Sequence, residues 1–264
     1  MKEIQANKEA WDILAKDHYK TFKKRLEDKD HDLNEIIISE LKNIKDKRII
    51  HLQCNTGFDT ILLSRKEVKE VVGVDFSKQN IYYANQLKKD FNIKHVSFIE
   101  SDVLDLINIH KETYDIVYTS EGVLGWIPDI NKWAKVVSSL LNKDGYVYIF
   151  DSHPIFMTLD EEKHDQSRLL EVKYPYFSNS YDTSSVIGGY ASDAKEATNH
   201  FWSHKTSDII SALANAGLMI EFFHEFDSLF WNNGQMKEML KGMYQYEDFK
   251  DKLPFSYSIK AKKI

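Results

Sequence analysis

Cysteine is nearly absent from this sequence, with only Cys54 among 264 residues. A single thiol forms no internal disulfide and provides no cluster of metal ligands, and it fits a reducing interior. Long apolar runs are missing too. No segment approaches the roughly 18 apolar residues of a membrane span, and the first 20 residues lack the apolar core of a signal peptide. We therefore expect a cytoplasmic protein with no metal and no membrane contact.

Runs of residues with the same charge are also scarce. The formal net charge is −6 and the isoelectric point about 5.9, with acidic and basic residues interspersed. No basic face is available for phosphates, so nucleic acid is not an expected partner. Apolar residues make up 42% of the chain, which is enough for one substantial core. We expect a single domain that is a monomer or a homodimer.

Hydrophobic periodicity divides this domain into four parts. Residues 1–46 repeat an apolar face at helical spacing, and from residue 47 short β-branched runs alternate with amphipathic helical stretches up to 154. Residues 155–205 are polar and aromatic with turn signals, which indicates an insertion after the fifth strand. Residues 206–264 predict a helix, a strand, a helix from about Gln235 to Asp251, and a final strand.

Strands that alternate with helices predict an α/β fold with right-handed crossovers and a mainly parallel sheet. The expected architecture is a Rossmann-like three-layer sandwich with seven strands and an antiparallel last strand. Two adjacent late strands indicate that antiparallel pair. Such a sheet binds its ligand at the carboxyl ends of its strands. Residues that carry chemistry are therefore expected at these strand ends.

The loop in "RIIHLQCNTGFDTILLSRK" joins a strand to a helix and contains one glycine, Gly57. Such loops direct backbone N–H groups at a ligand, Gly57 permits close approach, and Gln53 and Asn55 offer hydrogen bonds. An ordinary turn between packed elements explains a single glycine equally well. Asp75 ends the next strand, 18 residues beyond Gly57, where a carboxylate can bind the two hydroxyls of a ribose. The alternative for Asp75 is a helix cap, a role that the neighbouring Ser77 can fill.

At the end of the third predicted strand, the carboxylate of Asp102 and the backbone of Val103 can together bind adenine, with Asp105 as the alternative acid. A nicotinamide dinucleotide would need glycines more strictly, because its pyrophosphate must lie on the helix N-terminus. The loop therefore favours a cofactor without phosphate.

Four successive motifs carry a resemblance to a known family: "IIHLQCNTGFDT", "VVGVDFS", "FIESDVLDL" and "YDIVYTSEGVLGWIPDINKWA". Over about residues 45–155 the chain resembles the class I S-adenosylmethionine-dependent methyltransferases, and within them a bacterial small-molecule subgroup. The family commonly has an acid at His51 and glycines at Gln53 and Asn55, so the backbone path of this loop is an open question.

The resemblance implies S-adenosylmethionine as the cofactor, with residues 1–46 as a helical lid over it. Gly57, Asp75, Asp102 and Val103 keep the roles given above. Phe76 would pack on the adenine and Ser120 would lie near the methionine portion. Tyr19, on the lid, is expected at the cofactor.

Transfer of an activated methyl group needs alignment of the acceptor and, for a protonated acceptor, a base. His153, just after the fifth predicted strand, and His204 are the candidates, although either histidine can be structural. Aromatic residues at the expected opening predict a substrate pocket, chiefly Trp126, Tyr176, Tyr181 and Trp202. The predicted function is methyl transfer to a small-molecule O, N or S atom. The alternatives are an inactive cofactor-binding sensor or partner protein, and an NAD(P)-dependent oxidoreductase.

Overall fold

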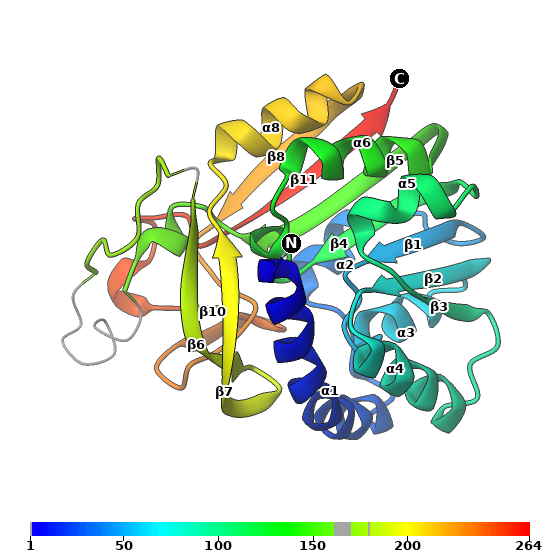
Figure 1. Ribbon diagram of the computed structural model, residues 1–264, viewed down its shortest axis with the longest axis horizontal. Coiled ribbons are helices and arrows are strands. Elements are labelled where there is room, and N and C mark those ends of the chain that lie inside the picture. The colour runs from blue at the N-terminus through cyan, green and yellow to red at the C-terminus, as the bar shows by residue number, and fades with distance from the viewer. Residues whose placement is uncertain (1, 161–169, 179) are drawn as a thin grey trace.

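The computed structural model describes residues 2–160, 170–178 and 180–264. A seven-stranded sheet with the order β3-β2-β1-β4-β5-β11-β8 lies at its centre, between two layers of helices (Figure 1). The helices are α1 (Lys2–Glu27), α2 (Glu35–Glu40), α3 (Phe58–Ser64), α4 (Lys78–Asp90), α5 (Leu106–Ile109), α6 (Ile130–Leu140) and α8 (Thr206–Asn215). The strands of the sheet are β1 (Arg48–Leu52), β2 (Glu70–Asp75), β3 (Val96–Glu100), β4 (Tyr114–Ser120), β5 (Leu141–Ser152), β8 (Leu218–Phe226) and β11 (Ser256–Lys263).

Alternate residues of each central strand pack on opposite faces of the sheet, because successive side chains of a strand point to opposite sides. On β4, Val117 joins the core beneath α5, α6 and α8, whereas Ile116 and Tyr118 join the core beneath α1, α2, α3 and α4. Both faces of the sheet are therefore covered by helices. This explains why the strands read as nearly continuous apolar runs in the sequence.

Strands β1 to β5 are parallel, and β11 pairs antiparallel with both β5 and β8. The fold predicted from the sequence is confirmed, including the antiparallel last strand. Among the described residues no helix is long and apolar enough to cross a membrane.

Two excursions cover the carboxyl ends of the central strands. The first contains an antiparallel hairpin, β6 (Tyr181–Gly189) and β7 (Ser192–Trp202), within the predicted insertion. The second lies between β8 and β11 and contains the hairpin β9 (Lys237–Leu240) and β10 (Met243–Gln245). The helix predicted over Gln235–Asp251 is therefore wrong. Helix α1 contacts both β7 and α4, and Figure 1 shows it between the β6–β7 hairpin and the α3–α4 side of the sheet.

Candidate active site

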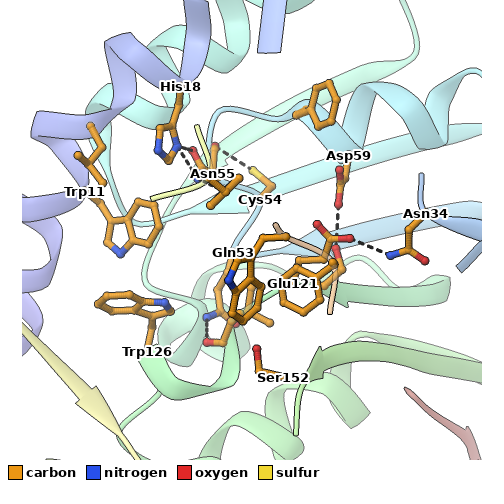
Figure 2. Close-up of a pocket in the computed structure, with 18 of the residues that line it drawn as sticks. Trp11, His18, Asn34, Gln53, Cys54, Asn55, Asp59, Glu121, Trp126 and Ser152 are labelled. Atoms are coloured by element: carbon orange, nitrogen blue, oxygen red, sulfur yellow. Dashed lines mark hydrogen bonds between the residues drawn. The ribbon is translucent and has the colours of Figure 1, made fainter. Parts of the chain in front are cut away.

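A cavity of about 1050 Å³ lies at the carboxyl ends of the parallel strands (Figure 2). Its wall includes Gln53 after β1, Asp75 at the end of β2, Asp102 after β3 and Ser120 at the end of β4. Helix α1, the β6–β7 hairpin and the β9–β10 excursion also line it. The strand ends chosen from the sequence thus converge on one cavity.

The loop after β1 follows a path suited to glycine. Gln53, Asn55 and Gly57 have φ values of 56°, 52° and 78°, all in the left-handed region. The family commonly has glycine at the first two positions, since glycine reaches this region without steric cost. Asparagine tolerates it through local hydrogen bonds, but glutamine is unusual there. The substitutions therefore leave the glycine-type path in place.

Hydrogen bonds from the two substituted side chains stabilise this strained loop. Gln53 donates its Nε2 to the carbonyl of Val123 at 2.7 Å, while its Oε1 is buried with no partner in the described chain. Asn55 accepts a hydrogen bond from the backbone N–H of Thr56 at 2.6 Å. Its amide then donates to Nδ1 of His18 at 3.0 Å, and burial lowers the pKa of His18 to about 4, so a neutral acceptor is expected. One substituted residue thereby ties the loop to α1.

Asp75 stabilises the same loop through a hydrogen bond from the loop's backbone. One carboxylate oxygen accepts from the backbone N–H of Asn55 at 2.9 Å, and the other from the backbone of Ser77 and the amide of Asn80 at 2.9 and 3.1 Å. Burial raises its pKa to about 6, and these hydrogen bonds oppose the rise. Because an ionised carboxylate has about four acceptor positions, one remains for a ligand hydroxyl. The ribose role stays a prediction, and Ser77 is the cap of α4 as expected.

The predicted adenine end is assembled from three residues that line the cavity, Phe76, Asp102 and Val103. One oxygen of Asp102 accepts from the backbone N–H of Leu104 at 2.9 Å, and burial raises the pKa of Asp102. The carboxylate keeps acceptor capacity next to an aromatic face. An aromatic face beside a hydrogen-bond acceptor is the chemistry that an adenine ring requires.

Gly57 has a different task from the one predicted. An added Cβ would lie 2.6 Å from the ring of Phe98 and 3.1 Å from Ala84. The close approach that needs glycine is therefore to β3 and α4 of the chain itself. Gly57 is not among the residues that line the cavity.

Neither predicted catalytic histidine reaches the cavity. His153 is 1% exposed, packs edge-on against Tyr257 and lies 3.0 Å from the carboxylate of Glu225. Its Nδ1 accepts from the backbone N–H of Ile155. The Nε2 of His204 lies 2.7 Å from the carbonyl oxygen of Ile127, and His204 lines a separate pocket of only about 40 Å³. Since a carbonyl only accepts, the ring nitrogen of His204 is the donor. Both rings hold the fold together, and we correct both assignments.

Of the four aromatic residues predicted for the substrate pocket, one lines the cavity. Trp126 lines the cavity and meets Trp11 of α1 with ring centroids 5.2 Å apart (Figure 2). Tyr176 and Trp202 line the small second pocket instead, and Tyr181 is 39% exposed and bonds Glu3. These three are therefore not cavity residues.

Tyr19 faces away from the cofactor region. Its hydroxyl donates to Asp90 at 2.7 Å, and its ring lies against Tyr83 of α4. Its role is to anchor α1 to the outer helix. The α1 residues that do line the cavity include Trp11, His18 and Arg25. Their spacing of seven places them on one helical face, which is the signal that would have identified them.

Two acidic residues that the sequence analysis did not select lie in the cavity wall. Asp59, in the first turn of α3, accepts from the hydroxyl of Ser120 at 2.9 Å. Glu121, directly after β4, accepts from the amide of Asn34 at 2.9 Å and has a left-handed φ of 63°. Burial and the neighbouring carboxyl raise the pKa of Glu121 to about 8, and burial raises that of Asp59 to about 6. Glu121 follows the predicted Ser120 at a strand end, so its position was a usable signal.

Comparison with known proteins gives one family match. The model of a methyltransferase domain matches residues 43–216. A protein of Haemophilus influenzae, described only as uncharacterized, is 23% identical over 96% of this chain and 97% of its own length.

Solved structures show the same fold. A protein of Listeria monocytogenes assigned as an S-adenosylmethionine-dependent methyltransferase has a TM-score of 0.61 and 18% identity, over 87% of this chain and 96% of its own. An S-adenosylmethionine-dependent methyltransferase of Mesorhizobium loti has a TM-score of 0.58 and 16% identity, over 86% and 96%. The domain match spans more than half of the sequence, and the sheet order and cavity agree with it. The chain therefore belongs to the class I S-adenosylmethionine-dependent methyltransferase family.

Proposed function

We propose that this protein transfers the methyl group of S-adenosylmethionine to a small molecule held in the cavity. The observation that carries the proposal is the cavity itself, at about 1050 Å³. Ligand pockets commonly measure about 300–1,000 Å³, so this one has room for a cofactor and a small acceptor together. Helix α1 and the two excursions close around it, which favours a small acceptor over a polymer.

The residues of the cavity fit the proposed cofactor. Asp102 and Phe76 offer an acceptor and an aromatic face for adenine, and Asp75 keeps one acceptor position for ribose. The Oε1 of Gln53 is a buried acceptor without a partner in the described chain, and Gln53 lines the cavity. The loop presents no row of glycine N–H groups to a pyrophosphate, and nothing here favours a nicotinamide dinucleotide.

When bound, S-adenosylmethionine supplies a methyl group already activated by the positive sulfur. The remaining work belongs to the chain. Loop 53–57 and the acids after β2 and β3 orient the cofactor, and Trp11 and Trp126 close one side of the cavity against water. Ser120 ends β4 and donates its hydroxyl to Asp59, and we place it between the cofactor end and the acceptor end of the cavity.

We assign the parts of the single domain accordingly. Residues 1–46 form the lid, 47–154 the cofactor-binding core, 155–205 part of the substrate wall, and 206–264 the end of the sheet together with a second part of that wall. Support for the lid comes from α1, which bonds the loop through His18, α4 through Tyr19 and the β7 backbone at His200 through Asn7.

Calorimetry with S-adenosylmethionine, S-adenosylhomocysteine and NAD tests the cofactor. We expect binding of the first two and none of NAD. Turnover of methyl-labelled S-adenosylmethionine over a panel of amines, alcohols, thiols and carboxylic acids then tests catalysis. Binding without turnover of any acceptor would favour a sensor, and tight binding of NAD alone would refute the proposal.

A further inference from the structure

The cavity continues beyond the residues assigned to the cofactor. Most of those residues lie at the ends of β1, β2 and β3, and Ser120 ends β4, whereas Glu121 follows Ser120 and its backbone N–H donates to the carbonyl of Phe150 of β5. Asn34 holds its carboxylate from the side of α2, and Gly242 of the second excursion packs over Asn34. Asp59 reaches the same place from α3 (Figure 2). The proposed cofactor contacts leave the carboxyls at this end of the cavity without a ligand group.

The two carboxyls are underused as hydrogen-bond acceptors. Each accepts one side-chain hydrogen bond of normal geometry in the described chain, from Ser120 to Asp59 and from Asn34 to Glu121. The neighbouring Asp151 contrasts with them, because backbone N–H groups of residues 122, 123, 124 and 152 occupy its oxygens. One oxygen of Asp59 and one of Glu121 therefore remain for a ligand that donates protons.

A second feature points to the same ligand position. The hydroxyl of Tyr118 is completely buried and makes no hydrogen bond of normal geometry within the described residues. It lies next to Ser120, and the carboxyls of Asp59 and Glu121 help to raise its pKa. The hydroxyl interacts weakly with Asp59 and Ser120 at the base of this pair, and a buried hydroxyl without a hydrogen bond of normal geometry can gain one from a polar ligand group.

The positive charge near Asp59 and Glu121 does not form an ion pair with either carboxyl in the described chain. Arg25 is the cation that lowers the pKa of both carboxyls, but its guanidinium donates to the carbonyl of Tyr190 and forms no ion pair in the described chain. Tyr244, whose pKa Glu121 helps to raise, lies near the pair, and the rings of Phe230 and Trp231 line the same cavity. Aromatic faces beside carboxylates attract a cation from both sides.

We propose that Asp59 and Glu121 bind the ammonium group of the methyl acceptor, and that the acceptor is a small basic amine methylated at nitrogen. The proposal rests on the function proposed above. It makes Glu121 the group that accepts the proton which the nitrogen must lose. The lone pair so freed forms the new bond to the methyl carbon while the methyl–sulfur bond breaks. The electron pair of the broken methyl–sulfur bond stays on sulfur, and S-adenosylhomocysteine leaves as a neutral thioether. The raised pKa of Glu121, about 8, suits a base that works near neutral pH.

Matched pairs of amines and alcohols test the proposal. Phenethylamine, tryptamine, ethanolamine and putrescine are compared with phenethyl alcohol, tryptophol, ethylene glycol and 1,4-butanediol, with and without S-adenosylhomocysteine, by calorimetry and by methyl transfer. We expect at least one amine to bind tenfold or more tightly than its alcohol. Glu121→Gln and Asp59→Asn, which keep their hydrogen-bond partners, should each weaken that amine at least tenfold. Glu67→Gln removes one charge from a side chain that is 75% exposed and lies outside the cavity lining, and it should leave amine binding within threefold.

A cofactor arm distinguishes the other source of an ammonium group, the methionine portion itself. Affinity for S-adenosylhomocysteine should stay within threefold in Glu121→Gln and Asp59→Asn. A tenfold loss there, with 5′-methylthioadenosine unaffected, would assign the pair to the cofactor and overturn the proposal. Equal binding of amines and alcohols by the unaltered protein would also overturn it. Failure of the unaltered protein to bind S-adenosylhomocysteine would instead refute the proposed function, and the amine measurement without cofactor would still decide the ammonium site.

Discussion

Replacement of Glu121 by glutamine should stabilise the protein above neutral pH. The carboxyl has a pKa of about 8 in the folded chain, raised from 4.5 by burial and by Asp59. Between these two values the folded state binds more protons than the unfolded state, so the free energy of unfolding falls as pH rises. Below about pH 4.5 both states are protonated at this position and the penalty vanishes. Glutamine carries no such proton and can still accept from Asn34.

The size of the effect follows from the two pKa values. The difference between 4.5 and about 8 is worth at most about 5 kcal/mol at 1.36 kcal/mol per pKa unit. Entry of water into the cavity lowers this ceiling, and we expect about 1–3 kcal/mol at pH 8.5. The charged groups that act on Glu121 are Asp59, Asp151 and Arg25, and the variant leaves all three in place.

Urea unfolding at pH 5 and pH 8.5 measures the effect. Glu121→Gln should raise the midpoint at pH 8.5 and change it little at pH 5, relative to the unaltered protein. Glu67→Gln removes the same charge from a side chain that is 75% exposed, and it controls for net charge. An equal or larger gain at pH 5, or a loss at pH 8.5, would refute the reasoning.

Substitutions at four further positions test the rest of the site. Asp75→Asn should weaken S-adenosylhomocysteine binding by roughly 1–3 kcal/mol, measured by calorimetry, because an amide cannot accept all the hydrogen bonds of the carboxylate; unchanged affinity would contradict the ribose role. His153→Gln should lower the unfolding midpoint and leave cofactor affinity within threefold, since the ring lies outside the cavity; a large loss of affinity with an unaltered midpoint would restore a functional role. By urea unfolding, Asn55→Ala should have a free energy of unfolding about 1 kcal/mol lower than that of Asn55→Gly, because only glycine enters the left-handed region without cost; the reverse order would show that the conformation is not strained. Gly57→Ala should cost more than 1 kcal/mol by the same assay, since its Cβ would meet Phe98 at 2.6 Å; a neutral result would show that Phe98 moves freely.

The sheet could be predicted because its signal is local. Val117 and its neighbours Ile116 and Tyr118 are all apolar, and an unbroken apolar strand is what two covered faces require. The ligand-binding edge followed from the parallel order, so Gln53, Asp75, Asp102 and Ser120 were found at the cavity. Placement at a strand end was the reliable part of the prediction.

The second excursion was mispredicted because its apolar spacing is helical. Met236, Met239, Leu240 and Met243 recur as on a helix, but Met239 and Leu240 are 44% and 45% exposed. Gly242 has a φ of 74° and allows the turn between β9 and β10. Only Met236 and Met243 face the interior. Tertiary packing decided between two structures that the local sequence allows.

The histidines were misplaced for a topological reason. His153 does follow β5, but β11 inserts beside that strand and brings Tyr257 against the ring, while Glu225 of β8 reaches it from the next strand. A strand of opposite direction between β5 and β8 cannot be positioned from the sequence around residue 153. Asp59 and Glu121 were missed because each lies within two residues of one that had already been given the local role, Gly57 and Ser120.

The buried carboxyls after β4 and in α3 also bear on how heat is exchanged when a ligand arrives. With a pKa of about 8, Glu121 keeps its proton at pH 7 while no cation is near. A positively charged guest favours the ionised form, so its arrival expels hydrogen ions into the surrounding buffer. The apparent heat of association measured in Tris should then differ from that in phosphate, and the number of hydrogen ions released follows from the slope against the buffers' own ionisation heats.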